Sequence, residues 1–506
     1  RKRAWNCIAW LQDAVWFECH RKYAGYGGWL MGWSLPEVPE KEQAPSWSPW
    51  NCLLIIILGL FTGLLVAVLK SPATGLLSLS SGAWLPLTAW TFAGISAAIA
   101  VYTFRQEMLA VRVWNWNEWC RNMRLKWRLR AQQHLVILSH VFITADTGLL
   151  DRLAHTQEEE SADTSPLTML PDEPLTPGIS RFEQLLRHLI AQIMPSIRRR
   201  YSSGPLQIIV QTNGSDKDRE SQSFYRIWSA GSPPWKAEIH FQDADSSFDG
   251  WNQFVASTKR PVLVLAMHYR LPNDVLPEFA SALFLMPPSM LNPGEQKNAL
   301  RLFRAMPLNT RMLATELTEL RDMALTSASK KHLVWHSGLS DAPRQSVSRV
   351  LNDLSVPLYD SIGTGGVIDY DTASVRYGGL AGWAMTGAAA EMAAYGPTSQ
   401  WLLLEGEDDA WAVSLGNAAP AVGHDHFVIQ PPFPGGSVLM ALLLNAGLYS
   451  LMIRYFPSTA FSWAGISLLL LSMIVTLPGL AILLRRITAR LQRPEFIRVA
   501  RHSGKE

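Results

Sequence analysis

Residues 52–69 read CLLIIILGLFTGLLVAVL, eighteen apolar or small residues without a charge. At 1.5 Å of rise per residue, a helix of this length is about 27 Å long, close to the thickness of the hydrocarbon core of a bilayer. Buried helices of large soluble proteins seldom run so far without a charged residue. Three further stretches share this character, at residues 84–104, 436–453 and 461–484. The sequence therefore predicts a polytopic membrane protein with four transmembrane helices.

Charged residues are few and nearly balanced: the 506 residues include 45 Lys and Arg against 42 Asp and Glu, a net charge of +3. They make up 17% of the chain, against roughly 25% in ordinary soluble proteins. Such a balance offers no bulk electrostatic attraction to nucleic acid. The four cysteines, at positions 7, 19, 52 and 120, all precede residue 121. Residues 121–435 therefore have neither a disulfide scaffold nor a thiol nucleophile, and no Cys-ligated zinc site.

Basic residues cluster beside the predicted spans. Residues 1–51 hold six Lys and Arg, and residues 105–131 and 485–506 hold seven each, whereas the two short loops within the helix pairs hold almost none. Because positive residues near spans stay on the cytoplasmic side, each helix pair is predicted to be a hairpin with both ends in the cytoplasm. We expect a bacterial inner-membrane protein with both termini and the middle segment cytoplasmic, and with the lipid bilayer as one partner.

The resulting organisation has six segments. They are a cytoplasmic N-terminal segment (1–51), a first transmembrane hairpin (52–104), a basic Trp-rich juxtamembrane helix (105–131), a cytosolic α/β domain (132–435), a second transmembrane hairpin (436–484) and a basic cytoplasmic tail (485–506).

The juxtamembrane segment repeats tryptophan at helical spacing with basic residues in between. Its members are Trp116, Trp119, Trp127, Arg121, Arg124 and Arg128. This pattern predicts an amphipathic helix that lies in the membrane interface against anionic headgroups. The alternative, that the tryptophans pack on the protein, stays open. Because the neighbouring span explains the basic residues, we expect no nucleic-acid partner.

The middle of the chain alternates apolar runs with amphipathic stretches. PVLVLAMHY (261–269) is a continuous apolar run, typical of a strand buried on both faces. LQIIVQT (206–212), ALFLMP (282–287), HLVWH (332–336) and QWLLLEG (400–406) are further strand candidates. Helix-like stretches separate most of these runs, which predicts a layered α/β domain with a buried sheet.

Two stretches of the second half give this domain a family resemblance. HSGLSD (336–341), followed by a helix, resembles the His-Gly-Thr loop of β-ketoacyl synthases, and GGLAGWAMTGAAAEMAAY (378–395) resembles their alanine-rich helix that follows a Gly-His pair. The resemblance covers about residues 130–420. It implies a thiolase-like fold.

The chemistry of that family requires a cysteine thiolate and two histidines that activate it and stabilise an oxyanion. By rough register, the nucleophile position falls near Ser246 and Ser247, and His336 stands at the first histidine position. The second histidine position falls on Gly378 and Gly379. The resemblance therefore implies a degenerate, non-catalytic copy. The alternative is an acyl-transfer enzyme at the membrane that uses Ser246 or Ser247 with His336.

Other motifs are weaker. GTGG (363–366) lacks the pattern of a phosphate loop and favours a tight turn. His424 and His426 in GHDH are weak metal candidates, because two ligands in a loop do not make a site. EGEDD (405–409) stands at a strand end, where a solvated turn is the commoner role. We therefore expect no metal and no cofactor.

The function expected from these features is scaffolding or docking at the membrane. Tethering a domain at both ends raises its effective concentration for membrane-bound partners, which suits a subunit of an envelope or secretion assembly. Expected partners are other membrane or secretion-machine proteins, and a homo-oligomer is a further expectation. A transporter is disfavoured because the four spans lack ionisable residues that would line a path.

Overall fold

The fold is described from a computed structural model of the chain. The structure describes residues 38–45, 47–70, 81–153, 167–170, 177–231, 233–246, 251, 254–255, 258–271, 274–297, 299–323, 330–359, 365–406, 410–417 and 430–503. These residues form two compact units, an α/β unit within 128–417 and a helical unit made of 38–127 and 430–503.

The α/β unit contains these strands: β1 (His134–Thr144), β2 (Gly204–Thr212), β3 (Trp235–Gln242), β4 (Val262–His268), β5 (Phe279–Met286), β6 (Leu300–Phe303), β7 (Met306–Pro307), β8 (Leu333–Ser337), β9 (Val367–Asp369), β10 (Gln400–Glu405) and β11 (Ala410–Gly416). Its helices are α4 (Leu149–Leu153), α5 (Arg181–Arg200), α6 (Lys217–Ala230), α8 (Pro293–Lys297), α9 (Leu313–Asp322), α10 (Asp341–Asp353), α11 (Tyr370–Ala373) and α12 (Ala381–Met392).

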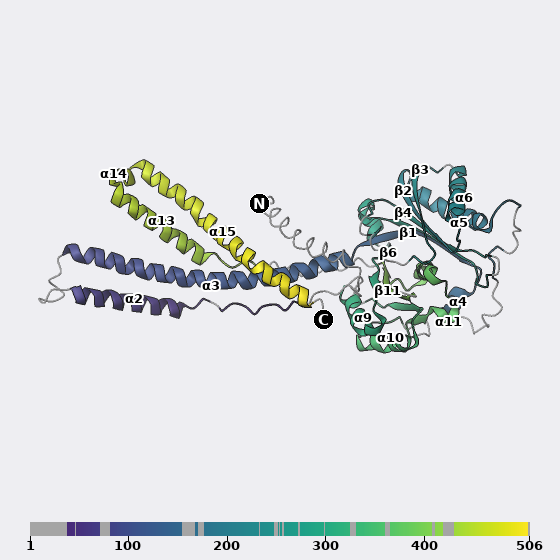
Figure 1. Cartoon of the computed structure of the whole chain (residues 1–506), viewed down its shortest axis with the longest axis horizontal. Helices are drawn as coiled ribbons and strands as arrows, with labels where there is room; N and C mark the ends of the chain where they lie inside the picture. Colours follow the sequence, from purple (N-terminus) through teal and green to yellow (C-terminus); the bar gives the residue numbers. More distant parts are fainter. Residues whose placement is uncertain are drawn as a thin grey trace. The chain divides into compact units, whose positions relative to one another are not determined.

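The described strands form one sheet in the order β3-β2-β4-β5-β1-β6-β11-β10-β8-β9, with β7 paired to β11 (Figure 1). In the first half, β2 is parallel to β3 and β4, whereas β5 runs antiparallel to β4 and to β1. In the second half, β8 is parallel to β9 and β10, whereas β11 runs antiparallel to β10 and to β6. The two halves thus repeat one topology, and the β1–β6 pair joins them.

The core lies on both faces of the sheet. In β4, Val264 faces a cluster that includes Trp383 of α12, whereas the next residue, Leu265, faces a cluster with Leu186 of α5 and Phe224 of α6. Burial on both faces explains the continuous apolar run of this strand. The predicted layered α/β domain is therefore confirmed.

Helix α12 is almost entirely buried, and its small residues explain how it fits. A Cβ atom on Gly387 would lie 2.6 Å from the Ser281 Oγ and 2.8 Å from the Phe142 ring. Only glycine allows the helix backbone to approach β5 and β1 this closely. The alanine-rich sequence is therefore a packing requirement of this layer.

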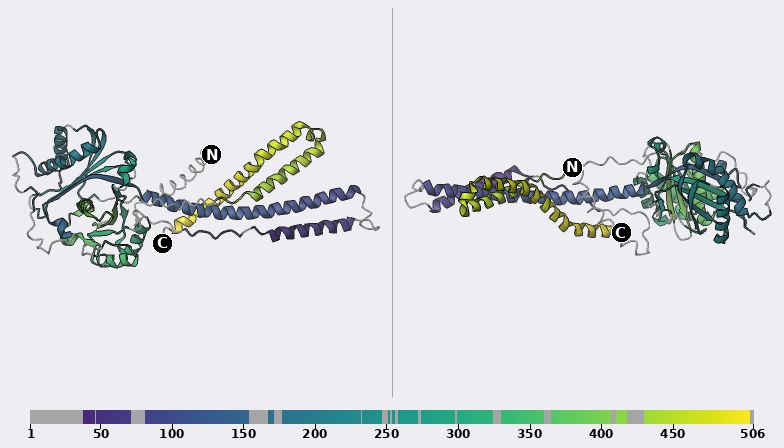
Figure 2. Two further views of the ribbon diagram at one scale, coloured as in Figure 1. Left: turned by 180° about the vertical axis from the view of Figure 1, so that it is seen from behind. Right: turned by 90° about the horizontal axis from the view of Figure 1, so that it is seen from above.

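The helical unit contains α2 (Pro49–Lys70), α3 (Ser81–Ala131), α13 (Gly435–Tyr455), α14 (Pro457–Ala460) and α15 (Trp463–Ser503). Four of these described helices are long and apolar enough to cross a membrane, namely α2, α3, α13 and α15. The chain is therefore predicted to associate with a membrane. Figure 2 shows α13 and α15 side by side, and Asn445 joins them by hydrogen bonds with Thr476 (2.7 Å) and Ser472 (2.6 Å).

Helix α3 contains both the second predicted span and the whole juxtamembrane segment, without a break between residues 104 and 105. The segment 105–131 is thus continuous with the helix of the second predicted span. Helix α15 likewise includes both the fourth span and most of the basic tail.

Candidate functional site

The candidate site lies where the parallel strands β8, β9 and β10 end. His336 is on β8 beside Asp369, the last residue of β9, and beside Leu403 of β10. Since the carboxyl ends of parallel strands meet at one edge of a sheet, polar residues that follow these strands come together there. The sequence-predicted histidine therefore occupies a position at which α/β folds commonly build sites.

His336 is buried, with 5% of its surface exposed. Its Nδ1 atom lies 3.7 Å from Asp369 Oδ1, and the other carboxylate oxygen of Asp369 pairs with Arg344. Burial lowers the pKa of His336, although Asp369 partly offsets this effect. A neutral imidazole with a carboxylate neighbour is suited to accept a proton in principle.

The carboxylate of Asp371 organises the loop after β8. It accepts hydrogen bonds from Ser337 Oγ (2.7 Å) and Gly338 N (2.8 Å), and it pairs with Arg376 at 2.9 Å. Gly338 has a φ of +79°, which favours glycine. These groups satisfy one another, so the cluster has the features of a structural network.

Glu405, the first residue of the EGEDD motif, belongs to the same edge. Its carboxylate accepts hydrogen bonds from Thr310 Oγ1 (2.8 Å) and Ser340 N (2.9 Å). This carboxylate therefore fixes two loops. The rest of the acidic run, residues 407–409, lies outside the described residues.

Ser246 lies in the loop that follows β3. The Gln211 side-chain amide donates to the carbonyl oxygens of Asp243 (3.1 Å), Ala244 (2.9 Å) and Ser246 (3.2 Å), and the Trp383 indole donates to Gln211 (2.8 Å). Among the described residues, no histidine or carboxylate forms a hydrogen bond with the Ser246 hydroxyl. Ser247 lies outside the described residues.

Gly379, at the second histidine position, touches that same loop. A Cβ atom on Gly379 would overlap the carbonyl oxygen of Ala244 and lie 2.8 Å from the Cα of Asp245. Real Cβ atoms do not approach other heavy atoms this closely. The structure therefore leaves no room at position 379 for a histidine side chain, because the backbone of the loop after β3 fills that space.

His268 was not singled out in the sequence, although it ends the apolar run that forms β4. Its Nε2 lies 3.3 Å from Asp274 Oδ2. Its ring centre lies 5.3 Å from that of Tyr377, with the two rings tilted by 54°, and Tyr377 precedes the Gly378–Gly379 pair. Burial lowers its pKa. A histidine at the end of a buried strand was the available signal. Asp274 follows six residues later, whereas Tyr377 comes from a distant segment.

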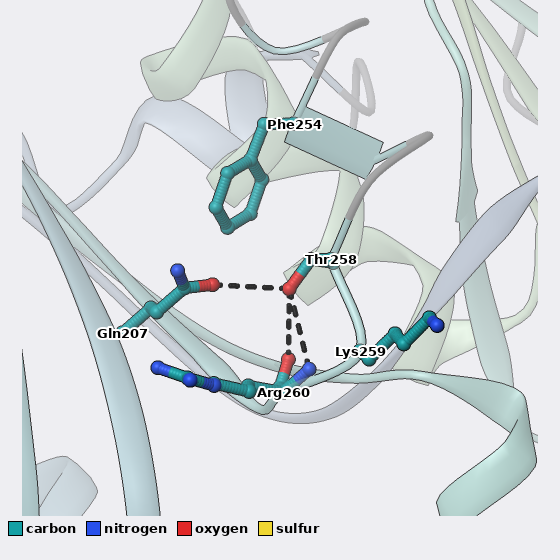
Figure 3. A pocket seen from close by; sticks show the side chains of 5 residues that line it. All are labelled: Gln207, Phe254, Thr258, Lys259 and Arg260. Carbon is teal, nitrogen blue, oxygen red and sulfur yellow. Dashed lines mark hydrogen bonds between the residues drawn. The ribbon is translucent and has the colours of Figure 1, made fainter.

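A small cavity opens elsewhere on the unit, beside β2. It has a volume of about 270 Å³ and is lined by Gln207, Phe254, Thr258, Lys259 and Arg260 (Figure 3). The Thr258 hydroxyl donates to Gln207 Oε1 at 3.0 Å, which fixes the floor of the cavity. Among the described residues, neither Ser246 nor His336 lines it.

The metal and phosphate candidates find no support in the described part of the chain. No group of three His, Cys, Asp or Glu side chains there is placed to hold a metal ion, and His424 and His426 lie outside the described residues. Of the GTGG motif, Gly365 and Gly366 are described, and both have positive φ angles, as the tight-turn alternative requires.

The predicted membrane-interface residues have protein partners. Trp116 is buried and stacks edge-on against Phe496 of α15 at 5.1 Å, and Trp119 does so at 5.3 Å. Arg121 bonds to the Asn117 carbonyl oxygen (3.2 Å), and Arg124 pairs with Glu40 (2.7 Å). The tryptophans therefore have the contacts with protein that the alternative describes, and the contact with headgroups stays a prediction.

The last two residues of that set, Trp127 and Arg128, lie near the C-terminal end of α3, and both make interactions within the protein.

No protein-family model matches the sequence, and no curated protein is detectably similar to it. Solved structures are similar over 56% of the chain. They include a type II polyketide ketosynthase with its acyl-carrier protein (AntDE:AntF; 10% identity, 99% of that chain, TM-score 0.40), cerulenin-bound OleA from Xanthomonas campestris (11%, 96%, 0.32) and β-ketoacyl-[acyl carrier protein] synthase III from Thermus thermophilus (11%, 100%, 0.33). The similar solved structures thus include ketosynthases, as the resemblance in sequence predicted. At these values the likeness concerns the fold and says nothing about activity.

Proposed function

We propose that the protein is a membrane-anchored docking protein whose α/β unit is non-catalytic. The observation that carries the proposal is the contact between Gly379 and the backbone of Ala244 and Asp245. In this contact the loop of the expected nucleophile meets the position of the second expected histidine. An acyl substrate would have to enter the space that these backbones occupy.

The polar network around His336 supports the same conclusion. A general base has to reach the proton that it abstracts. His336 is buried beside Asp369, and in the described structure it shares no hydrogen bond with Ser246. Arg344 also neutralises the Asp369 carboxylate that would otherwise stabilise an imidazolium ion. The groups therefore stabilise the sheet edge, and the unit keeps its fold without the catalytic set.

Docking follows from the way the unit is attached. The α/β unit is inserted between α3 and α13, so helices that are long and apolar enough to span a membrane precede and follow it in the chain. Attachment at both ends confines the unit to one membrane surface and raises its effective concentration for partners embedded there. Cytoplasmic placement at a bacterial inner membrane, with an envelope or secretion assembly as the partner, is part of this proposal.

The proposal is tested by purifying the full-length protein in mild detergent from its own host and quantifying the co-purifying proteins by mass spectrometry. We expect a stoichiometric set of envelope proteins whose recovery is unchanged by Ser246→Ala, Ser247→Ala or His336→Ala. Recovery of acyl carrier protein or lipid-synthesis enzymes, lost with His336→Ala, would overturn the proposal. So would an acyl adduct on either serine, detected by intact mass after incubation with acyl donors.

A further inference from the structure

Beyond the α/β unit, the helical unit contains a parallel helix pair formed by the ends of α3 and α15. Thr488 Oγ1 contacts Met108 Sδ at 3.5 Å, Gln492 Nε2 donates to the Arg112 carbonyl oxygen at 2.9 Å, and Phe496 stacks on Trp116. Each of these contacts joins residues 380 positions apart, so the register is constant over about two helical turns. We call this helix pair the stalk.

The two helices of the stalk make few stabilising contacts with each other. Its apolar cluster is small, with Trp116, Cys120 and Phe496 as the buried members that come from the helices. Two buried amide groups of the stalk, Asn115 Nδ2 and Gln492 Oε1, have no hydrogen-bond partner in the described structure. Both atoms stay unpaired with the rest of the described chain in place, and unpaired buried polar groups cost free energy, so the helix pair depends on other favourable contacts to stay closed.

An extended segment supplies those contacts. Residues 38–41 (Val-Pro-Glu-Lys), here called the strap, lie against the stalk without secondary structure of their own. The Asn117 side chain forms two hydrogen bonds with the backbone of Lys41. It accepts one from the Lys41 N–H (2.8 Å) and donates one to the Lys41 carbonyl oxygen (2.9 Å). The Trp116 indole donates to the Pro39 carbonyl oxygen at 3.0 Å. These three bonds fix the strap on α3.

The strap also reaches α15. The Lys41 ammonium group lies 3.8 Å from the centre of the Trp116 ring and 3.5 Å from Glu495 Oε1. Val38 is buried in the cluster with Phe496, and its carbonyl oxygen lies 3.7 Å from Cys120 Sγ. One short segment thus contacts both helices of the stalk and covers the Cys120 thiol.

From this geometry we propose that the strap is a releasable clasp that holds α15 against α3 and so joins the two hairpins at their membrane-proximal ends. The contacts made by its charged side chains are partly exposed, with 39% and 61% exposure for Lys41 and Glu495. Exposed ion pairs are weak and screened by salt. The backbone bonds to Asn117 are therefore the principal fastening, and their loss opens the stalk.

The reactivity of the Cys120 thiol shows whether the clasp is open or closed. It is fully buried under the strap, so a maleimide reacts with it only after the clasp opens. The experiment uses the full-length protein in detergent with Cys7→Ser, Cys19→Ser and Cys52→Ser, which leaves Cys120 as the single thiol. The labelling rate is expressed relative to the rate in denaturant.

We expect Asn117→Leu to accelerate labelling about tenfold or more, since two hydrogen bonds are lost. The matched control is Asn122→Leu on the same helix, whose amide bonds only to Glu118 (3.0 Å), and it should leave the rate unchanged. Equal rates for Asn117→Leu and the parent, or a parent as fast as the denatured protein, would overturn the proposal. Unchanged gel-filtration behaviour and helical content show that each variant is folded.

A second comparison covers the case in which Asn117→Leu does not fold. Glu495→Lys should accelerate labelling by repulsion from Lys41, and adding Lys41→Glu should restore part of the protection. No effect of the single charge change would count against the contact between strap and α15. Protection that falls when the protein is diluted would show that the strap comes from a second copy, and would replace the clasp by an exchange between subunits.

Discussion

Arg181 and Glu278, 97 positions apart, form a two-point ion pair inside the α/β unit, with Arg181 Nε 2.9 Å from Glu278 Oε1 and a second nitrogen 2.5 Å from Oε2. The carboxylate, fully buried, also accepts from the backbone N–H groups of Met169 (2.8 Å) and Arg270 (3.0 Å). One carboxylate thus fixes the start of α5 and two loops.

Replacing Arg181 should therefore destabilise the unit strongly. Arg181→Met leaves the Glu278 carboxylate buried without its cation, which costs about 3 kcal/mol. Arg187→Met, an exposed change on the same helix, is the control. Thermal unfolding of the detergent-solubilised protein, followed by tryptophan fluorescence, measures the difference; equal midpoints for the two variants would contradict the assigned role.

The same pair gives stability an acid limit. Burial alone would raise the pKa of Glu278, but hydrogen bonds from Arg181 and the two backbone N–H groups lower it on balance. A carboxylate whose folded pKa is depressed contributes stability that is present above its unfolded pKa and is lost as the pH falls through the folded value. Arg181→Met should remove this part of the acid sensitivity, which a series of unfolding curves below pH 5 would reveal.

His332 is expected to destabilise the folded unit at mildly acidic pH. Burial lowers its pKa to about 4, and its Nδ1 lies 3.0 Å from the Ser399 hydroxyl. The unfolded chain binds the proton near pH 6.5, so stability is full above that value and falls as the pH decreases from 6.5 towards 4. Between pH 7.5 and 5 the loss should be about 2 kcal/mol. His332→Gln should flatten this pH dependence, and an unaltered slope would refute the assignment.

Glu316 should have the opposite effect. Burial raises its pKa to about 7, with a further contribution from Glu319, and its Oε2 atom is buried without a hydrogen-bond partner. A carboxyl group whose folded pKa is raised loses stability as the pH rises from 4.5 to 7. Glu316→Gln should stabilise the protein by about 2 kcal/mol at pH 8 and by much less at pH 5. Glu319→Gln, which removes only the neighbouring charge, should give a smaller gain in stability. Chemical denaturation at pH 5 and pH 8 measures the free energy of unfolding of each variant.

The sequence predicts those features that depend on local composition. The four long apolar helices are predicted because the absence of charge over eighteen residues is visible without a structure. His336 is placed near a strand end because HLVWH is a short apolar run. The continuity of α3 could also be inferred from the sequence, since neither proline nor glycine occurs between residues 95 and 131. A change from apolar to basic composition alters the environment of a helix without ending it.

Contacts between segments that are distant in the chain could not be predicted from the sequence. The two halves of the sheet repeat a topology without an obvious repeat in sequence, because strand order is set by packing. The strap contacts residues on α3 more than seventy positions away, and Val-Pro-Glu-Lys has no pattern of its own. His268 likewise acquires Tyr377 as a neighbour only through the fold.

The packing of Gly379 gives the most direct check on the proposed non-catalytic role of the α/β unit. Gly379→Ala should destabilise the unit by about 2 kcal/mol, because the new methyl group overlaps the Ala244 backbone and the loop is held by Gln211. Gly294→Ala is the matched control: its Cβ would meet nothing within 4 Å and it lies in a short helix, so the change should be neutral or slightly stabilising. Differential scanning fluorimetry of the three proteins compares them. A Gly379→Ala protein as stable as its parent would mean that the loop after β3 moves aside at little cost. A substrate could then enter beside Gly379, and the proposal of a non-catalytic unit would lose its main support.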